Sequence, residues 1–293
     1  MTLDGTNTYL LDAGDGRAAV IDPGPDDPAH GDAILAAVRA RGLEVAEILV
    51  THGHPDHAPG AAYVHARTGA RVWAHPRARF PHDVACEDGA AIELGSLVLH
   101  AIDAPGHAPD HLVFWLAEER VLFTGDVVIG RGSVVVAPPA GDMRTYQATL
   151  ERLRRDFAEA SSIFGGHGER LDSPLATLDA YIAHREARER EILAALAEGA
   201  QTIPQLVTHI YHATDRVLWP AAARQVLAYL IALEREGRVR PHALAREPNA
   251  EERAILQPDL SRLVDPGALA VAAAELGFGA PNEPLRAYER RRP

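Results

Sequence analysis

The first ninety residues alternate between short apolar runs and amphipathic segments. Apolar runs at residues 17–22, 45–50 and 71–74 predict strands. Between them, apolar residues three and four positions apart predict helices around residues 34–38 and 60–67. This β-α-β alternation is typical of a sheet that is covered by helices.

From residue 92 the pattern changes. Three apolar segments at residues 97–102, 111–116 and 120–123 follow one another with short connections, which predicts an antiparallel meander. A helix at residues 145–157 and a strand at residues 162–164 complete this part of the chain. The first part of the chain therefore alternates, and the middle is a run of adjacent strands.

The C-terminal part is mostly helical. A long amphipathic helix is expected from Tyr181 to Ala197, a second one up to Tyr211 with Thr202 as its N-cap, and a third from Ala221 to Glu236. A short strand or wing at residues 238–241 follows, so that three helices and a small β element predict a winged-helix module. Beyond residue 246 the pattern predicts only a helix from Ala268 to Leu276.

Composition narrows the classes of chemistry. The 293 residues include 41 acidic and 29 basic residues, and every basic one is arginine, so a lysine Schiff base and a P-loop lysine are excluded. Cys86 is the single cysteine, which excludes an internal disulfide and a thiolate-rich zinc site and favours a cytoplasmic protein. Without a long apolar run, no membrane partner is expected.

The densest group of chemically active residues follows the strand at residues 45–50. Here three histidines and an aspartate fall within six residues, as His52, His54, Asp56 and His57. Imidazole nitrogens and carboxylate oxygens are suitable zinc ligands. In extended chain His52 and His54 point to the same side, and a turn after Pro55 lets the next two residues face a second ion.

Three further candidate ligands stand at strand ends. His107, Asp126 and His167 each come after an apolar strand and directly after a glycine. Glycine lets the backbone turn sharply and approach closely, so that each side chain can reach a common point. Seven residues that are distant in sequence are therefore expected to form one metal site.

These residues resemble the metallo-β-lactamase superfamily. The motif His52-x-His54-x-Asp56-His57 and the later His107, Asp126 and His167 match its ligand motifs in order, over about residues 5–170. The resemblance implies a four-layer αββα sandwich with two zinc ions, for which iron or manganese are alternatives. It also implies that His52, His54 and His107 hold one ion, that Asp56, His57 and His167 hold the other, and that Asp126 bridges them.

A closer resemblance extends to about residue 240. The segments Gly5–Leu11 and Pro105–His111, the pair His184-Arg185 and the region 203–239 are similar to the β-lactamase-like protein 2 group, which has a C-terminal winged-helix domain. The domains expected are a catalytic one at 1–180, a winged-helix-like one at 181–245 and an extension at 246–293 of unknown role.

Two departures from this group stand out. Met1 is only four residues from Gly5, whereas residues that form an opening strand usually precede this segment, so that the strand is absent or the true start lies upstream. In addition, Gly53 occupies a position where an aromatic residue is common, which predicts a wider site mouth.

The function implied is hydrolysis of an ester-type bond by a metal-bound hydroxide, either the phosphodiester of single-stranded RNA or a thioester. The fifty residues from 201 to 250, with 4 acidic residues and 6 arginines, favour RNA slightly, whereas the net charge of −12 weighs slightly against it. Asp56 is the candidate catalytic base. His111 is either a second catalytic residue or a histidine bonded to backbone. Asp22 and Asp110 are weak candidates to orient the metal-binding histidines.

Two other functions stay open at this point. One is a mononuclear iron oxidoreductase of the persulfide type, and the other is a nucleic-acid-binding regulator with a vestigial metal site. The partners expected are a small ester or thioester, or single-stranded RNA, together with a second copy of the chain in a homodimer.

Overall fold

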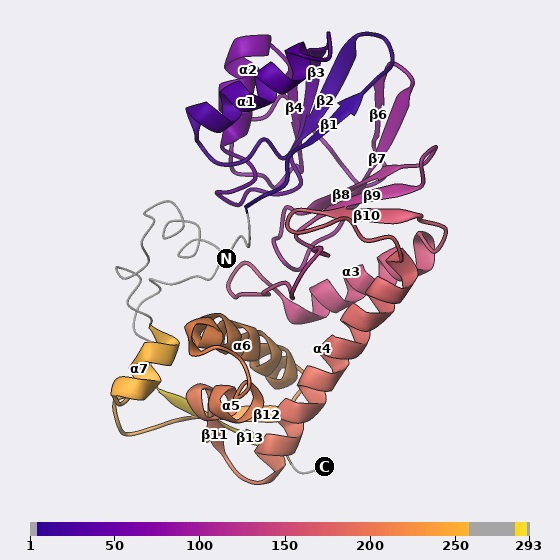
Figure 1. Cartoon of the computed structure of the whole chain (residues 1–293). Helices are drawn as coiled ribbons and strands as arrows, with labels where there is room; N and C mark the ends of the chain where they lie inside the picture. The colour runs from indigo at the N-terminus through magenta and orange to yellow at the C-terminus, as the bar shows by residue number, and fades with distance from the viewer. Residues whose placement is uncertain (1–4, 258–284, 292–293) are drawn as a thin grey trace. The chain divides into compact units, whose positions relative to one another are not determined.

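The computed structural model describes residues 5–257 and 285–291. It divides the chain into two compact units, Met1–Val134 with Thr149–Asp179, and Val135–Ala148 with Ala180–Pro293 (Figure 1). The short segment Val135–Ala148 therefore belongs to the second unit, although the chain before and after it belongs to the first.

The first sheet has the strand order β1-β2-β3-β4-β5, in which β2 to β5 are parallel and β1 is antiparallel to β2. Its strands are β1 (Tyr9–Asp12), β2 (Arg17–Ile21), β3 (Glu44–Leu49), β4 (Arg71–Ala74) and β5 (Val84–Ala85). Strand β1 lies within and just after the segment Gly5–Leu11, so the opening strand expected before Gly5 falls outside the described residues.

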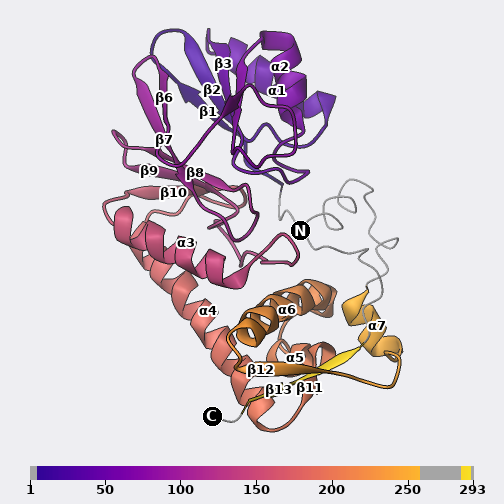
Figure 2. The same cartoon turned by 180° about the vertical axis from the view of Figure 1, so that it is seen from behind.

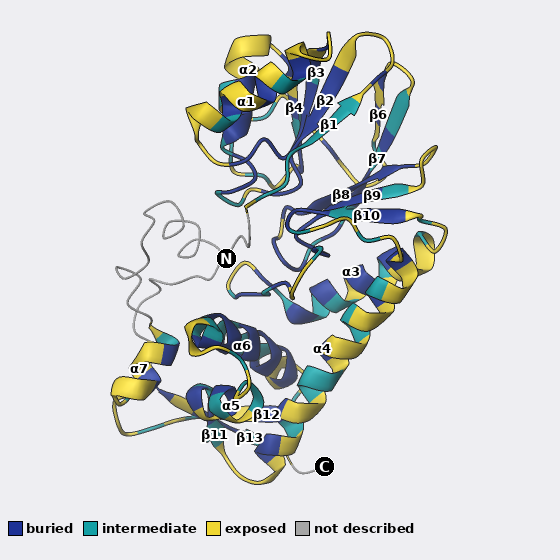
Figure 3. Cartoon of the chain, viewed as in Figure 1, coloured by how far each residue is buried: buried dark blue, intermediate teal, exposed yellow. Residues whose placement is uncertain are grey.

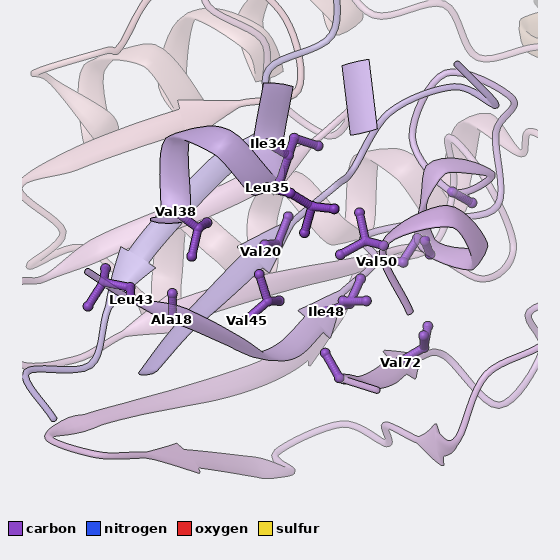
Figure 4. Close-up of a cluster of buried hydrophobic side chains, with 14 residues drawn as sticks. Ala18, Val20, Ile34, Leu35, Val38, Leu43, Val45, Ile48, Val50 and Val72 are labelled. Carbon is purple, nitrogen blue, oxygen red and sulfur yellow. The ribbon is translucent and has the colours of Figure 1, made fainter. Parts of the chain in front are cut away.

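Helices α1 (Pro28–Arg39) and α2 (Gly60–Thr68) lie side by side on one face of this sheet (Figures 1 and 2). Their outer positions are exposed, whereas the strands beneath them are mostly buried (Figure 3). Figure 4 shows the apolar layer between them, to which α1 contributes Ile34, Leu35 and Val38, and the strands contribute Val20 and Ile48. The predicted helical spacing at residues 34–38 reflects this buried stripe.

The second sheet has the order β10-β9-β8-β7-β6. Its strands are β6 (Ala91–Leu94), β7 (Leu97–Asp103), β8 (Leu112–Leu116), β9 (Val121–Gly125) and β10 (Ser162–Gly165). Strands β7 to β9 form the predicted meander, β6, which was not predicted, pairs antiparallel with β7, and β10 joins parallel to β9. All five residues of β8 are buried, which explains why its sequence is a continuous apolar run.

The two sheets pack face to face. Ile21 and Leu49 of the first sheet share a buried cluster with Leu99, Leu112 and Phe114 of the second. On the far side of the second sheet, the ring of Phe157, just after helix α3 (Met143–Asp156), lies 5.2 Å from that of Trp115. The αββα prediction is therefore confirmed, with helices outside two facing sheets.

The second unit contains the predicted winged-helix elements. Helix α4 (Pro174–Ala197) leads into β11 (Gln201–Thr202), α5 (Ile203–Ile210), the short 3₁₀ helix η1 (Arg216–Leu218), α6 (Trp219–Arg235) and β12 (Val239–Ala243). Thr202 caps α5 as predicted, within a reciprocal capping box with Gln205. Helix α7 (Ala250–Leu256) and strand β13 (Arg286–Arg290) follow.

Strand β13 was not predicted. It lies in the middle of a three-stranded sheet of order β11-β13-β12 and pairs antiparallel with both neighbours. The extension after residue 246 therefore completes the sheet of the winged helix. The helix predicted from Ala268 to Leu276 lies outside the described residues.

Among the described residues, one segment has the length and apolar composition of a membrane span. It is Arg216–Arg235, whose mean hydropathy reaches 1.2. Because 67% of that window is buried within the chain, its apolar side chains already have a protein environment, as in a core helix.

Candidate metal centre

Four of the predicted ligands lie in the loop that leaves β3. The backbone N–H groups of His57 and Ala58 both donate to the carbonyl of His54, at 3.0 and 3.1 Å, which closes a turn directly after His54. This turn brings Asp56 and His57 back toward the first two histidines. His52, Asp56 and His57 are at most 4% exposed.

The other three ligands come from the ends of second-sheet strands. His107 follows β7, Asp126 follows β9 and His167 follows β10, and each is at most 7% exposed. Gly166 allows the last of these loops to approach closely, because a Cβ atom there would lie 2.5 Å from Asp126 Oδ1. The three loops meet at the edge of the sandwich where β3 also ends.

The structure brings all seven side chains together. Three overlapping groups have ligand atoms within 4.8 Å of one another: His52, His54 and His107; His52, His57 and Asp126; and Asp56, His57 and His167. Asp126 lies between the histidines, with Oδ1 3.5 Å from His57 Nε2, and with Oδ2 3.3 Å from His167 Nε2 and 3.7 Å from His107 Nε2. Asp126 is therefore close to histidines that belong to each of the three groups.

The donor set fits a cation. Among the residues that the structure describes, His52 Nε2, His57 Nε2 and Asp126 Oδ1 are buried atoms without a hydrogen-bond partner. Leaving a buried polar atom unsatisfied costs about 1–3 kcal/mol, so three such atoms at one place need a ligand. Imidazole nitrogens and carboxylate oxygens at these separations suit zinc or a similar divalent metal.

Burial prepares the first group of histidines to bind metal. It lowers the pKa of His54 to about 3, helped by the nearby His107, and it lowers the pKa of His52 well below its usual range. Both rings are therefore neutral near pH 7 and keep a lone pair for a metal ion.

The second group is different. Burial alone would lower the pKa of His57, but Asp22, Asp126 and Asp56 together raise it to about 10. The pKa of Asp126 is well below its usual range, because the histidines around it outweigh the effect of its burial. Without a metal, a proton thus balances the carboxylates at this position.

Asp22 orients two of the loop residues. Its carboxylate accepts hydrogen bonds from the Thr51 backbone N–H at 2.8 Å, the Thr51 hydroxyl at 2.7 Å and His57 Nδ1 at 2.8 Å. The bond to Nδ1 directs His57 Nε2 toward the site, as outer carboxylates do in many metal centres. Asp110 does not do this for a ligating ring; it accepts the Gly53 N–H at 3.1 Å.

His111, predicted as a catalytic residue, contacts two of the predicted metal ligands, His52 and Asp126. It is fully buried, its ring stacks on that of His52 at 4.5 Å, and its Nε2 accepts the Asp126 N–H at 3.0 Å. Burial lowers its pKa well below the usual range, so the ring is neutral and can accept this bond. These contacts are those of a residue that positions Asp126, and a catalytic role for His111 stays a prediction.

The space beside Gly53 is filled rather than open. A Cβ atom at Gly53 would lie 2.8 Å from Asp110 Oδ2 and 3.6 Å from the ring of Phe80. Asp110 therefore restricts a larger side chain at this position, and the predicted effect of Gly53 on the width of the mouth stays a prediction.

Sequence reasoning missed two threonines that hold the ligand loops. Thr6 donates to Asp56 Oδ2 at 2.6 Å, and Thr149 of α3 donates to the carbonyl of Pro105, two residues before His107, at 2.6 Å. The only signal for Thr6 was its place in the segment Gly5–Leu11, which resembles the β-lactamase-like protein 2 group.

Comparisons with known proteins agree with this fold and site. Residues 1–167 match the metallo-beta-lactamase superfamily, and residues 202–246 match the beta-lactamase associated winged helix domain. Among solved structures, a metallo-beta-lactamase family protein from Thermus thermophilus superposes with a TM-score of 0.68 at 26% identity, covering 81% of this chain and 91% of that one.

Curated relatives extend the match. The beta-lactamase-like protein 2 homolog of Drosophila melanogaster is 34% identical over 84% of this chain and 88% of its own length. The thioesterase pkgB of Emericella nidulans is 36% identical over 67% of this chain and 56% of its own length. The expectation of an enzyme from a hydrolase-type family is confirmed, and the chain belongs to the metallo-β-lactamase superfamily, with the winged-helix domain associated with it.

Proposed function

We propose that this protein is a dinuclear zinc hydrolase that cleaves an ester-type bond, with thioesters as its first substrate class. The observation that carries the proposal is the convergence of seven side chains, six of them buried and His54 partly buried, into ligand groups around Asp126. Two zinc ions held there would supply a water nucleophile that is ionised near neutral pH and a Lewis acid for the scissile carbonyl oxygen.

The chain's own residues provide position and proton transfer. Asp126 lies between the two groups and is held by His111 through its backbone N–H. Asp56 is fixed by the hydroxyl of Thr6. In this proposal its carboxylate orients the attacking water and accepts its proton. Asp22 keeps the His57 ring turned toward the site.

Two observations support thioesters before RNA. The relative pkgB is named a thioesterase, and the match covers 67% of this chain and 56% of pkgB. The chain also carries a net charge of −12, which disfavours the approach of a polyanion. Single-stranded RNA, suggested by the resemblance to the β-lactamase-like protein 2 group, is the second substrate class to test.

A regulator that reads duplex nucleic acid is less well supported. In a winged helix the second helix of the helix-turn-helix enters the major groove, and here that helix is α6. No residue from Trp219 to Leu233 is exposed. One reason is that the Val136 N–H donates to Gln225 of α6, at 2.9 Å, within the second unit. The helix therefore lacks a free face for reading bases.

The proposal is tested by metal analysis together with turnover. Elemental analysis should find two zinc ions per chain, and release of free thiol from an acyl thioester should stop with a chelator and return with zinc. A single iron per chain with persulfide oxidation would support the oxidoreductase instead. If the protein cleaves a single-stranded RNA oligonucleotide but no thioester, RNA takes the place of thioesters as the proposed substrate class.

A further inference from the structure

The N-terminal segment Gly5–Tyr9 reaches the metal centre from outside the ligand motifs. Its last residue, Tyr9, is fixed by packing, because its ring lies 5.2 Å from that of Phe123 and 5.4 Å from that of Phe164 in the core between the sheets. The Tyr9 hydroxyl also donates to the carbonyl of Gly165, at 2.6 Å, in the loop that carries His167. The start of β1 is thus joined to the end of β10.

Asn7 joins the segment to the same loop at three further points. Its side-chain amide donates to the carbonyls of Gly165 and Gly168, at 3.0 and 2.8 Å, and its backbone N–H donates to the carbonyl of Gly166 at 2.7 Å. These bonds span the loop on both sides of His167. A short glycine-rich loop has few conformational restraints of its own, so its shape depends on this partner.

Two residues of the segment touch metal-binding side chains directly. The Gly5 carbonyl accepts a hydrogen bond from His167 Nδ1 at 3.0 Å, which turns Nε2 of that ring toward Asp126. The Thr6 hydroxyl donates to Asp56 Oδ2 at 2.6 Å. In addition, the Thr8 hydroxyl donates at 2.6 Å to the backbone carbonyl of Asp22.

These contacts share a pattern. Asp56, His57 and His167 form the second ligand group, and the segment reaches all three: Asp56 through Thr6, His167 through Gly5, and His57 through Asp22, whose carboxylate holds the His57 ring. The loop of His107, in the first group, is held instead from α3 by Thr149. Each group thus has an outer support of its own.

We infer that the segment Gly5–Tyr9 is a positioning element for one of the two cations, the one held by Asp56, His57 and His167, and that Thr6 sets its affinity. The inference rests on the proposed dinuclear site. Outer hydrogen bonds to metal ligands typically change metal affinity about 10- to 100-fold. Thr6 therefore acts through Asp56, without contacting the substrate.

The test uses two near-isosteric variants of the full chain, Thr6→Val and the matched control Thr149→Val. Cobalt(II) titration followed by visible absorption should show two binding steps in the wild type, assigned with His54→Ala and His167→Ala. Thr6→Val should weaken the step that His167→Ala removes by about 10- to 100-fold and leave the other step unchanged. Thr149→Val should leave the cobalt affinity of that same step unchanged. Thr6→Ser, which keeps the hydroxyl, should bind cobalt at that step as tightly as the wild type.

Outcomes separate this inference from the proposed function. Two tight steps in Thr6→Val, or an equal loss of both, would overturn the positioning role while leaving a dinuclear hydrolase in place. A wild type that binds fewer than two ions would overturn both proposals. If Thr6→Val has a lower urea midpoint than Thr149→Val, the near-isosteric Asn7→Asp variant gives a second measurement and must show the same selective loss.

Discussion

The two units of the molecule both bury charged side chains, but they satisfy them in different ways. In the second unit Arg185 is 1% exposed, its guanidinium lies 5.0 Å over the ring of Tyr146, and the Tyr229 hydroxyl donates to its carbonyl at 3.0 Å. Around it, Arg238 pairs with Glu189 at 2.6 Å. Buried side-chain atoms without a hydrogen-bond partner occur in both units, for example Gln225 Nε2 in the second. Among the described residues, however, only in the first unit do such atoms converge, because histidines and carboxylates there face one another within 4.8 Å.

This difference distinguishes structural from functional polar groups. Arg185 contacts the ring of Tyr146 and links α4 to α3, so its burial holds elements of one unit together. Unsatisfied atoms such as His52 Nε2 and His57 Nε2 lower the stability of the metal-free chain, and a ligand must compensate. Four predictions test this comparison through the effect of each change on metal binding.

The largest effect is expected for Asp126→Ala. Because Asp126 lies between both ligand groups, its loss should abolish turnover and lower the metal content of the purified protein. The control is Asp142→Ala, which removes a carboxylate paired with Arg235 in the second unit and should keep both ions. Elemental analysis and thiol release measure the two properties. Wild-type occupancy and rate in the Asp126 variant would remove this residue from the site.

The next effect is expected for Asp22→Asn. Replacing one carboxylate oxygen with an NH₂ group weakens its acceptance of the bonds from Thr51 and His57, so zinc affinity should fall about 10- to 100-fold. Asp110→Asn is the matched control, since Asp110 bonds the Gly53 N–H and no ligating ring. Competition with a chromogenic chelator measures both affinities. Equal losses in the two variants would contradict the role given to Asp22.

A smaller, graded effect is expected from pH. The pKa of His57 is about 10 in the metal-free chain, so a zinc ion must displace its proton at neutral pH. Asp126 also raises the pKa of His167 against the effect of its burial, so the apparent zinc affinity should rise at least about tenfold for each unit of pH between about 6.5 and 8. His54, with a pKa of about 3, adds nothing to this slope. Chelator competition across this range measures it, and a flat profile would mean that His57 is already neutral.

The ligands could be predicted from the sequence because each stands in a local context with a chemical meaning. His52 to His57 follow a buried strand, and Asp126 and His167 each follow a glycine at a strand end, so that local pattern and final position coincide. The same reasoning predicted Thr202 as a helix cap, because capping depends on residues three positions apart.

The parts that were missed depend on distant partners. Thr6 contacts Asp56 fifty residues away, and nothing in its own neighbourhood distinguishes it from a turn residue. Strand β13 has a mixed sequence, with arginines at both ends, and it becomes a strand only between β11 and β12. Pairing of this kind is decided by tertiary structure and not by local propensity.

The smallest effect on the metal is expected for Arg185→Met. This change removes a buried cation and its bond to Tyr146, and the free energy of unfolding should fall by about 1–3 kcal/mol in urea denaturation. Zinc content and turnover per folded molecule should stay at wild-type values, because Arg185 belongs to the second unit and the seven ligands belong to the first. Loss of zinc without loss of stability would contradict the structural role given to Arg185, because this residue would then support the metal centre rather than the fold.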